Sequence, residues 1–184
     1  YLLVDFDPLS TVHYLTSEGD FDLFVLCLAS DLSFNWVFSG GTDYAYCDAY
    51  TVAYNVAGNG SIYVSGSVSE PFDIDPGSGV TMLPGGNYIL KLTRDGEFQW
   101  AIPYSNIIGV LLAAEKNGNG GVIALSHFIY TVDADPGPGI YLLTSGGDTD
   151  FFVSRLDSNG IFSWAKQALG DGDDIGEAIA LTPD

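Results

Sequence analysis

Apolar and polar residues alternate in short runs along this chain, and glycine, asparagine or aspartate bounds most of the runs. A period of two places alternate side chains on the same face of a strand, which is typical of a half-buried β-sheet. Such runs predict strands near residues 50–54, 61–66, 88–92, 98–102, 110–114, 122–126, 151–156 and 162–166. The pattern therefore predicts an all-β fold.

Glycine-rich turns separate neighbouring runs, at residues 58–60, 93–97, 117–120 and 157–161. Glycine and asparagine tolerate the positive φ angles that tight turns between twisted strands require. Each of these turns is therefore expected to close an antiparallel hairpin.

A tryptophan recurs every 64 residues, at Trp36, Trp100 and Trp164, and a phenylalanine precedes each one by two positions. Because residues two apart share a face of a strand, each Phe and Trp pair is expected to be buried between stacked sheets. Long-period repeats of short strands and glycine turns are typical of propeller-like arrays. The chain is thus predicted to be a β-propeller-like array of four-stranded antiparallel blades, with about three repeats of 64 residues.

We expect one repeat array over residues 1–184. In this division, 1–48 contain the last two strands of a blade and a loop, 49–112 the second repeat, 113–176 the third, and 177–184 the start of a further blade. Two complete blades with partial ones on either side cannot close a ring, because propellers have about four to eight blades. The chain is therefore expected to be part of a larger propeller.

The composition predicts a folded and strongly acidic protein. Hydrophobic residues make up 47% of the chain, and 24 Asp and Glu against 5 Lys and Arg give a formal net charge of −19. Nucleic acid and anionic membrane surfaces would repel such a chain, and its apolar stretches are too short to cross a bilayer. We therefore expect no nucleic-acid partner and no membrane insertion by this segment.

The residues that most often carry catalysis lack a supporting pattern. Cys27 and Cys47 do not have the spacing of a zinc site, and they are expected either to form one disulfide or to remain free, with Cys27 on the surface. His13 and His127 have no nucleophile motif beside them. The sequence therefore predicts no catalytic residues.

One combination of motifs resembles a known family. Asp-x-Asp-Pro-Gly, a strand, and then Gly-x-Phe-x-Trp-Ala are similar to the β-propeller units called SBBP repeats, and residues 133–168 match best. The first copy departs from the pattern, because Leu9 replaces the glycine of the first motif and Leu32 the glycine of the second. The resemblance implies a large secreted or surface-anchored bacterial protein. It also implies an extracellular or cell-surface location, with partners among other domains of the same polypeptide or surface assembly.

Pairs of aspartates are the strongest candidate for a ligand site. In the first and third copies, the Asp-x-Asp-Pro motif is followed fifteen residues later by a second Asp-x-Asp pair. Calcium binds about six to eight oxygen ligands, mostly carboxylates, carbonyls and water. If the intervening residues fold back as a loop, four carboxylates meet, so calcium is the candidate cofactor. The candidate ligands are Asp5, Asp7, Asp20, Asp22, Asp133, Asp135, Asp148 and Asp150. The alternative is that the aspartates fix turns before proline.

The expected function is a non-enzymatic extracellular scaffold, adhesion or binding module whose loops calcium stiffens. One alternative is a lectin-like propeller with glycans as partners. Its exposed tyrosines would stack on sugar rings, and these are Tyr44, Tyr46, Tyr104 and Tyr130. A polysaccharide hydrolase is a further alternative, because paired carboxylates can hydrolyse glycosidic bonds. Every aspartate pair recurs with the repeat, however, which favours a structural role over catalysis.

Overall fold

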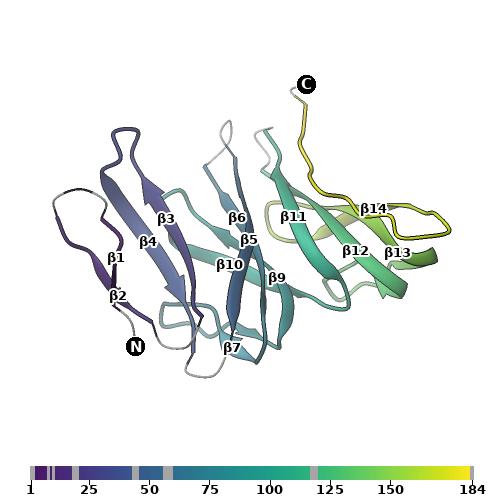
Figure 1. Cartoon of the computed structure of the whole chain (residues 1–184), viewed down its shortest axis with the longest axis horizontal. Helices are drawn as coiled ribbons and strands as arrows, with labels where there is room; N and C mark the ends of the chain where they lie inside the picture. Colours follow the sequence, from purple (N-terminus) through teal and green to yellow (C-terminus); the bar gives the residue numbers. More distant parts are fainter. Residues whose placement is uncertain are drawn as a thin grey trace.

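The computed structural model describes residues 3–7, 9, 11–17, 21–42, 46–55, 60–116 and 120–182. Regular structure in these ranges is entirely β, with fourteen strands and no helix (Figure 1). In the same ranges, therefore, nothing resembles a membrane-spanning helix. The all-β prediction is confirmed.

The N-terminal part contains two small antiparallel sheets. The first is a ribbon of β1 (Leu3–Asp5) and β2 (Tyr14–Thr16). The second, which we call the first sheet, pairs β3 (Leu23–Leu28) with β4 (Phe34–Gly40).

A second sheet of four antiparallel strands follows, in the order β10-β9-β6-β5. Its strands are β5 (Cys47–Tyr54), β6 (Ile62–Val68), β9 (Gly86–Leu92) and β10 (Phe98–Tyr104). A short ribbon of β7 (Phe72–Asp73) and β8 (Met82–Leu83) lies in the connection between β6 and β9.

The third sheet has the same meander, in the order β11-β12-β13-β14. Its strands are β11 (Ile108–Ala114), β12 (Val122–Asp133), β13 (Leu142–Leu156) and β14 (Phe162–Ala168). The two central strands pair along almost their full length, with a bulge at Tyr130. The outer ribbon, which is separate in the second sheet, is therefore continuous with the main ladder here.

The strand predictions agree with these elements. The runs at 50–54 and 61–66 pair as β5 and β6, and those at 110–114 and 122–126 as β11 and β12. Most residues of their connecting turns, 56–59 and 117–119, lie outside the described residues. Within the described part of the chain no strand follows Ala168, so the further strand expected in 177–184 stays a prediction.

The three sheets stack face to face and enclose two apolar clusters. Side chains of β6 alternate between them, so that Val64 joins the cluster with the first sheet and Tyr63 joins the cluster with the third. β9 alternates in the same way, with Leu90 in one cluster and Ile89 in the other. Because successive side chains of a strand point to opposite faces, the central strands β6 and β9 of the second sheet are buried on both faces.

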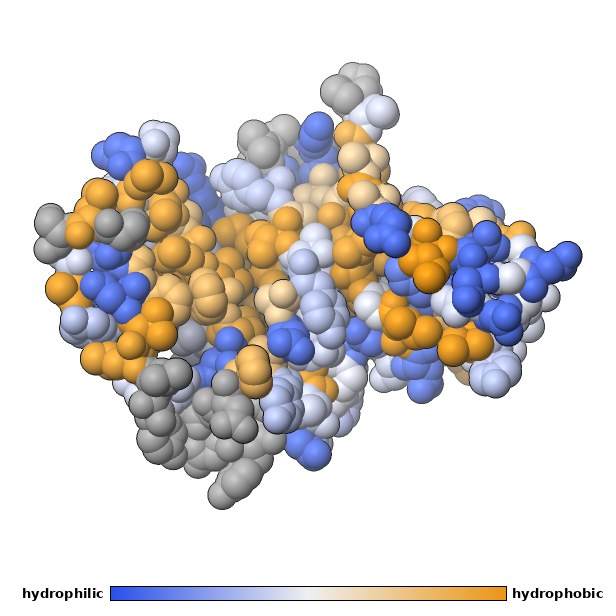
Figure 2. Space-filling model, in the orientation of Figure 1, coloured by the Kyte–Doolittle hydropathy of each residue, from blue (hydrophilic) through white to orange (hydrophobic). Residues whose placement is uncertain are grey.

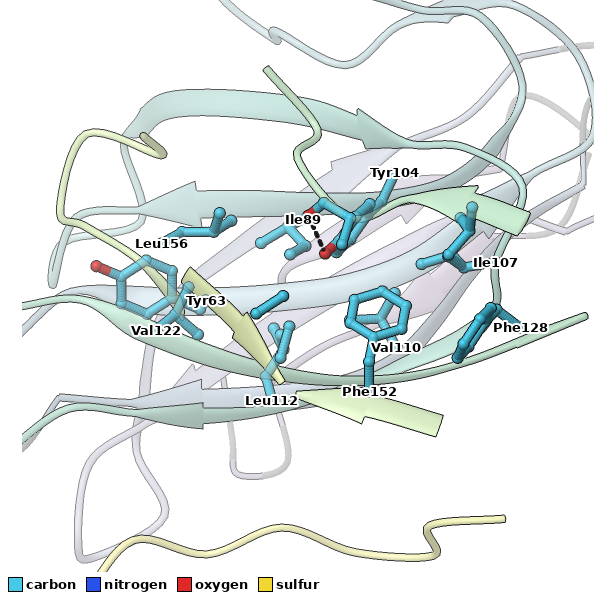
Figure 3. Close-up of a cluster of buried hydrophobic side chains, with 14 of the residues drawn as sticks. Tyr63, Ile89, Tyr104, Ile107, Val110, Leu112, Val122, Phe128, Phe152 and Leu156 are labelled. Atoms are coloured by element: carbon cyan, nitrogen blue, oxygen red, sulfur yellow. Dashed lines mark hydrogen bonds between the residues drawn. The ribbon is translucent and has the colours of Figure 1, made fainter. Parts of the chain in front are cut away.

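The cluster between the second and third sheets is built around large aromatic side chains (Figure 3). Phe152 packs edge-on against both Tyr104 and Phe128. The Tyr104 hydroxyl donates to the Ala134 carbonyl at 2.9 Å and shares a hydrogen bond of 2.9 Å with the Ser154 hydroxyl. These bonds matter because an unpaired buried hydroxyl costs about 1–3 kcal/mol. Burial also raises the pKa of Tyr104 above its usual range.

Equivalent turns connect the last two strands of each sheet, at 29–33, 93–97 and 157–161. In each turn the first backbone N–H donates to the last carbonyl, at 2.9, 2.8 and 2.9 Å respectively. Each turn needs one residue with positive φ, which is 82° at Gly96, 80° at Gly160 and 68° at Leu32. The first turn therefore places a leucine where the other two have glycine, at a cost of about 1–2 kcal/mol for the left-handed conformation.

Replacing Leu32 with glycine is expected to raise the free energy of unfolding by about 0.5–1 kcal/mol. The glycine removes the left-handed strain, while its greater freedom in the unfolded chain cancels part of the gain. Leu32 is 59% exposed, so little packing is lost. Urea unfolding followed by circular dichroism measures the change. Leu32→Ala is the control, since it shortens the side chain and keeps the strain; equal stabilities for the two variants would contradict the explanation.

Candidate functional site

The Asp-x-Asp-Pro motifs lie at the ends of the outer ribbons, where their carboxylates hold the loops closed. Oδ1 of Asp73 accepts backbone N–H groups of Asp75 at 3.1 Å and Thr81 at 2.7 Å. Oδ1 of Asp133 accepts those of Asp135 at 3.1 Å and Tyr141 at 2.8 Å. Each first aspartate thus ties both sides of its loop together, which is the turn-fixing role that aspartate often has.

The first copy repeats this arrangement. Oδ1 of Asp5 accepts the N–H groups of Asp7 at 3.0 Å and His13 at 2.9 Å. Asp7 accepts a hydrogen bond from the Thr11 hydroxyl and one from the Leu9 backbone, and these bonds lower the pKa of Asp7 below its usual range. Three copies of one motif therefore use their carboxylates in one way.

The second aspartate pair of the third copy lies inside a strand. Asp150 is fully buried, and its two carboxylate oxygens accept the N–H groups of Gly170 at 2.9 Å and Gly146 at 2.7 Å. Burial by itself raises the pKa of Asp150, but hydrogen bonds, chiefly from the backbone of Gly170, Gly146 and Gly147, outweigh it and lower the pKa. Asp148 is exposed. Asp150 is therefore a buried anion that ties the segment after β14 to β13.

The structure does not bring the two aspartate pairs of the third copy together. In the ladder of β12 and β13, Asp150 pairs with Phe128 while Asp133 pairs with Leu142. Phe128 and Asp133 are five residues apart along β12, which corresponds to about 16 Å at roughly 3.3 Å per residue. The expected meeting of four carboxylates therefore does not occur here, because the intervening residues form a short loop and then extend β13, which carries Asp150 away from Asp133.

The second pair of the first copy is described only in part. Asp20 lies outside the described residues, and Asp22 is half-buried beside Asp73 in a polar pocket of about 310 Å³. Among the described residues, no group of three or more His, Cys, Asp or Glu side chains is arranged to hold a metal ion. Calcium binding stays a prediction. The role that the hydrogen bonds show for the motif aspartates is to close the loops.

Replacing Asp133 with alanine is expected to lower the free energy of unfolding by about 1.5–3 kcal/mol, the range for hydrogen bonds to a charged group. The loss should be the same in excess calcium and in a chelator, because the carboxylate already accepts two backbone N–H groups. Thermal unfolding of both proteins in both buffers measures it. Asp148→Ala, at an exposed position, is the control. A loss that appears only with calcium would identify Asp133 as a metal ligand.

The tyrosines proposed for sugar binding do not form a common surface. Tyr104 is fully buried and hydrogen-bonded, so the expectation that it is exposed is wrong. Tyr46 and Tyr130 are exposed, the first beside the ring of Phe21 and the second in the bulge of β12. Tyr44 lies outside the described residues.

The two histidines and the two cysteines have structural surroundings. The ring of His13 stacks on Phe34, and the two ring nitrogens of His127 lie 3.0 Å from the carbonyl oxygens of Ile108 and Gly176. His127 thereby holds the segment after β14 against the third sheet. Both cysteines are free, so the disulfide alternative is not realised. Cys47 is buried, and burial together with the charges of Asp22 and Asp48 raises its pKa to about 11.

The two inner tryptophans link each sheet to the next. Nε1 of Trp36 donates to the Arg94 carbonyl, and Nε1 of Trp100 donates to the Ser158 carbonyl, both at 3.1 Å and both to the glycine turn of the following sheet. Trp36 and Trp100 also pack against the two apolar clusters. Trp164, in the last sheet described, is 38% exposed. Trp36 and Trp100 thus lie between sheets as expected, whereas the expectation that Trp164 is buried is wrong. Phe98 and Trp100 do not share a face either, because a bulge lies between them and they pack against different clusters.

A cleft lies between the first and second sheets, next to Trp36. It has a volume of about 720 Å³, and we call it the Trp36 cleft. Its walls come from β3, β4, β5, β6 and the turn between β9 and β10. The lining residues are Val25, Leu26, Cys27, Leu28, Asn35, Trp36, Val52, Tyr54, Ile62, Arg94 and Asp95. No local motif predicts this cleft, because its lining comes from strands that are far apart in the sequence.

No protein-family model matches the sequence, and no curated protein matches it. The resemblance to SBBP repeats therefore stays a prediction. The tryptophan links, the loop aspartates and the Trp36 cleft are the features on which function has to rest.

Proposed function

We propose that the chain is a non-enzymatic segment of a β-propeller-like array and serves as an extracellular scaffold or binding surface. The observation that carries this proposal is the repeated link from Trp36 to Arg94 and from Trp100 to Ser158, each spanning 58 residues. The same tryptophan hydrogen bond at two equivalent positions favours a repeating unit that stacks on its neighbours. In such arrays each unit contacts its neighbours and gains stability from them.

The packing of neighbouring sheets supports this reading. The Tyr63 hydroxyl of β6 donates to the Gly120 carbonyl at 2.6 Å, and the Ser65 hydroxyl donates to the Val110 carbonyl of β11 at 2.5 Å. Both hydrogen bonds join β6 of the second sheet to the β11–β12 hairpin of the third sheet. In the proposed array each 64-residue repeat supplies one four-stranded blade, whose first strand lies innermost.

Charge and site chemistry favour a scaffold over an enzyme. The carboxylates of the motif aspartates accept hydrogen bonds from loop backbone, and both carboxylate oxygens of Asp150 accept backbone N–H groups. A net charge of −19 suits a soluble surface protein that does not bind nucleic acid. The proposed partners are accordingly other domains of the same surface assembly.

Protease treatment of intact cells tests the proposed location. In cells of the source organism, the protein should be cleaved from unbroken cells, while a cytosolic marker protein is cleaved only after lysis. Assays with purified protein and a panel of polysaccharides should show no release of reducing sugar. Protection of the protein in intact cells, or measurable turnover of a polysaccharide, would contradict the scaffold proposal.

A further inference from the structure

In the part of the chain that the structure describes, strand β3 is paired along one edge, whereas its counterparts are paired along both. β9 is paired with β6 on one side and β10 on the other, and β13 is likewise paired with β12 and β14. Among the described residues, β3 is paired only with β4. Its other edge therefore presents backbone N–H and C=O groups that can accept an added strand.

The neighbouring face of β5 is exposed at positions that are covered in the third sheet. In the hairpins β5–β6 and β11–β12, the pairs of residues next to the turn are equivalent. They are Tyr54 with Ile62 in the first hairpin and Ala114 with Val122 in the second. Two residues before these pairs, Val52 is 57% exposed whereas Leu112 is 5% exposed. Leu112 is covered because it belongs to the cluster that Ala53 and Tyr63 of the β5–β6 hairpin enter. Val52 has no such hairpin in front of it among the described residues.

The Trp36 cleft lies between the edge strand β3 and the exposed face of β5. Residues 25–28 of β3 form one wall, and Val52 and Tyr54 of β5 form another. Apolar side chains gather over this part of the molecule, around β3 and β4 and toward β5 (Figure 2). The cleft therefore occupies the position that a hairpin equivalent to β5–β6 would fill in the first sheet.

We propose that the Trp36 cleft binds a β-hairpin with the inner-strand pattern of this repeat. One strand of the hairpin adds antiparallel to the free edge of β3, and the other packs on Val52 and Tyr54. Main-chain hydrogen bonds to β3 supply affinity, while alternate apolar side chains in the cleft supply specificity. This inference rests on the proposed repeat array and names the chemistry of a partner for the Trp36 cleft.

The second sheet fixes the expected register. Lys91 of β9 lies opposite Tyr63 of β6 and opposite Trp100 of β10. In the first sheet Cys27 lies opposite Trp36, so Cys27 is the counterpart of Lys91. A bound hairpin should therefore place the residue equivalent to Tyr63 directly opposite Cys27. Opposite residues in antiparallel strands have Cα atoms about 4.5–5.5 Å apart, which is within the range for a disulfide.

A peptide of residues 47–68 of this chain is the probe, since it is the hairpin that pairs with β9 in the second sheet. In the peptide, Cys47→Ser removes the native thiol, and Tyr63→Cys introduces one that carries a thionitrobenzoate group. The Cys27 thiolate attacks this mixed disulfide, forms a Cys27–peptide disulfide and releases thionitrobenzoate, whose absorbance gives the rate. At mildly alkaline pH the buried Cys47 of the protein stays protonated, because its pKa is raised to about 11.

The matched control is the same peptide with the thiol at Val64→Cys, one residue along the strand and on the opposite face. We expect the peptide with the thiol at position 63 to react at least about tenfold faster than the control, because binding raises the effective thiol concentration. Cys27→Ser protein should release no thionitrobenzoate. Excess peptide without a thiol should slow the reaction by competition.

Equal rates for the two peptides would overturn the proposal, as would a fast reaction that the thiol-free peptide does not slow. A stable dimer whose Cys27 is protected from the peptide would also overturn it, because a second copy would then occupy the cleft. A soluble glycan that blocks the reaction while the thiol-free peptide does not would assign the cleft to carbohydrate. None of these results bears on cleavage from intact cells, so failure here and failure of the surface-scaffold proposal are separate outcomes.

Discussion

Replacing Trp100 with alanine should lower the free energy of unfolding by about 3–5 kcal/mol, the cost typical of removing a large aromatic side chain from a packed interface. The indole packs against the cluster between the second and third sheets, and its Nε1 donates to the Ser158 carbonyl. Both contacts cross from one sheet to the next, so their loss should weaken the stacking itself. Urea unfolding followed by far-UV circular dichroism measures the change.

Trp164→Ala is the matched control, because it makes the same deletion at the equivalent place in the third sheet. Trp164 is 38% exposed, and its replacement should cost about 1 kcal/mol or less. Trp100→Phe separates packing from hydrogen bonding, since phenylalanine keeps most of the buried surface and loses only the N–H donor, at a cost of about 1 kcal/mol. Equal losses for Trp100→Ala and Trp164→Ala would show that the tryptophans do not act between sheets.

Local features of the sequence were sufficient to predict the strands and several of the turns. Alternation over five to seven residues and a glycine at the right place in a turn are short-range signals, and β10 and β14 follow them closely. The spacing of the tryptophans also predicted that Trp36 and Trp100 lie between sheets. The strand and turn predictions share one cause, which is that each depends on a few neighbouring residues. The period of two fails at the bulge between Phe98 and Trp100, which places these side chains in different clusters.

The burial of Tyr104 could not be predicted in this way. Tyr104 is the last residue of β10, and its ring and hydroxyl are enclosed only because the third sheet packs against it. Ser154 and Ala134 supply the hydrogen-bond partners of the hydroxyl. Asp150 shows the same limit. Two aspartate pairs fifteen residues apart look alike in the first and third copies, but the length of β13 decides whether they meet. Contacts between distant segments determined both outcomes.

The Trp36 cleft depends on a comparison that the sequence alone does not provide. Val52 and Leu112 are both apolar residues in the first strand of a hairpin, so nothing in their immediate sequence distinguishes them. Their different exposure follows from what lies in front of each strand. The shape and lining of the cleft therefore required the stacked sheets.

Replacing Gly96 with alanine should lower the free energy of unfolding by about 2–5 kcal/mol, through two separate effects. Gly96 has a φ of 82°, and a side chain in this left-handed conformation costs about 1–2 kcal/mol. A Cβ at this position would also lie 2.6 Å from Cδ2 of Trp36, so the indole or the turn must move. Overpacking of this kind costs about 1–3 kcal/mol. Chemical unfolding of the variant measures the sum.

Gly86→Ala provides the control for the backbone term, because Gly86 has a φ of 94° and nothing within 4 Å of an added Cβ. It should cost about 1–2 kcal/mol, and the excess at Gly96 then measures the contact with Trp36. A double-mutant cycle isolates that contact: in a Trp36→Ala background, Gly96→Ala should cost no more than Gly86→Ala does. If the full penalty persists without the indole, the glycine serves the turn alone, and the link between the first two sheets rests on the Trp36 hydrogen bond to Arg94.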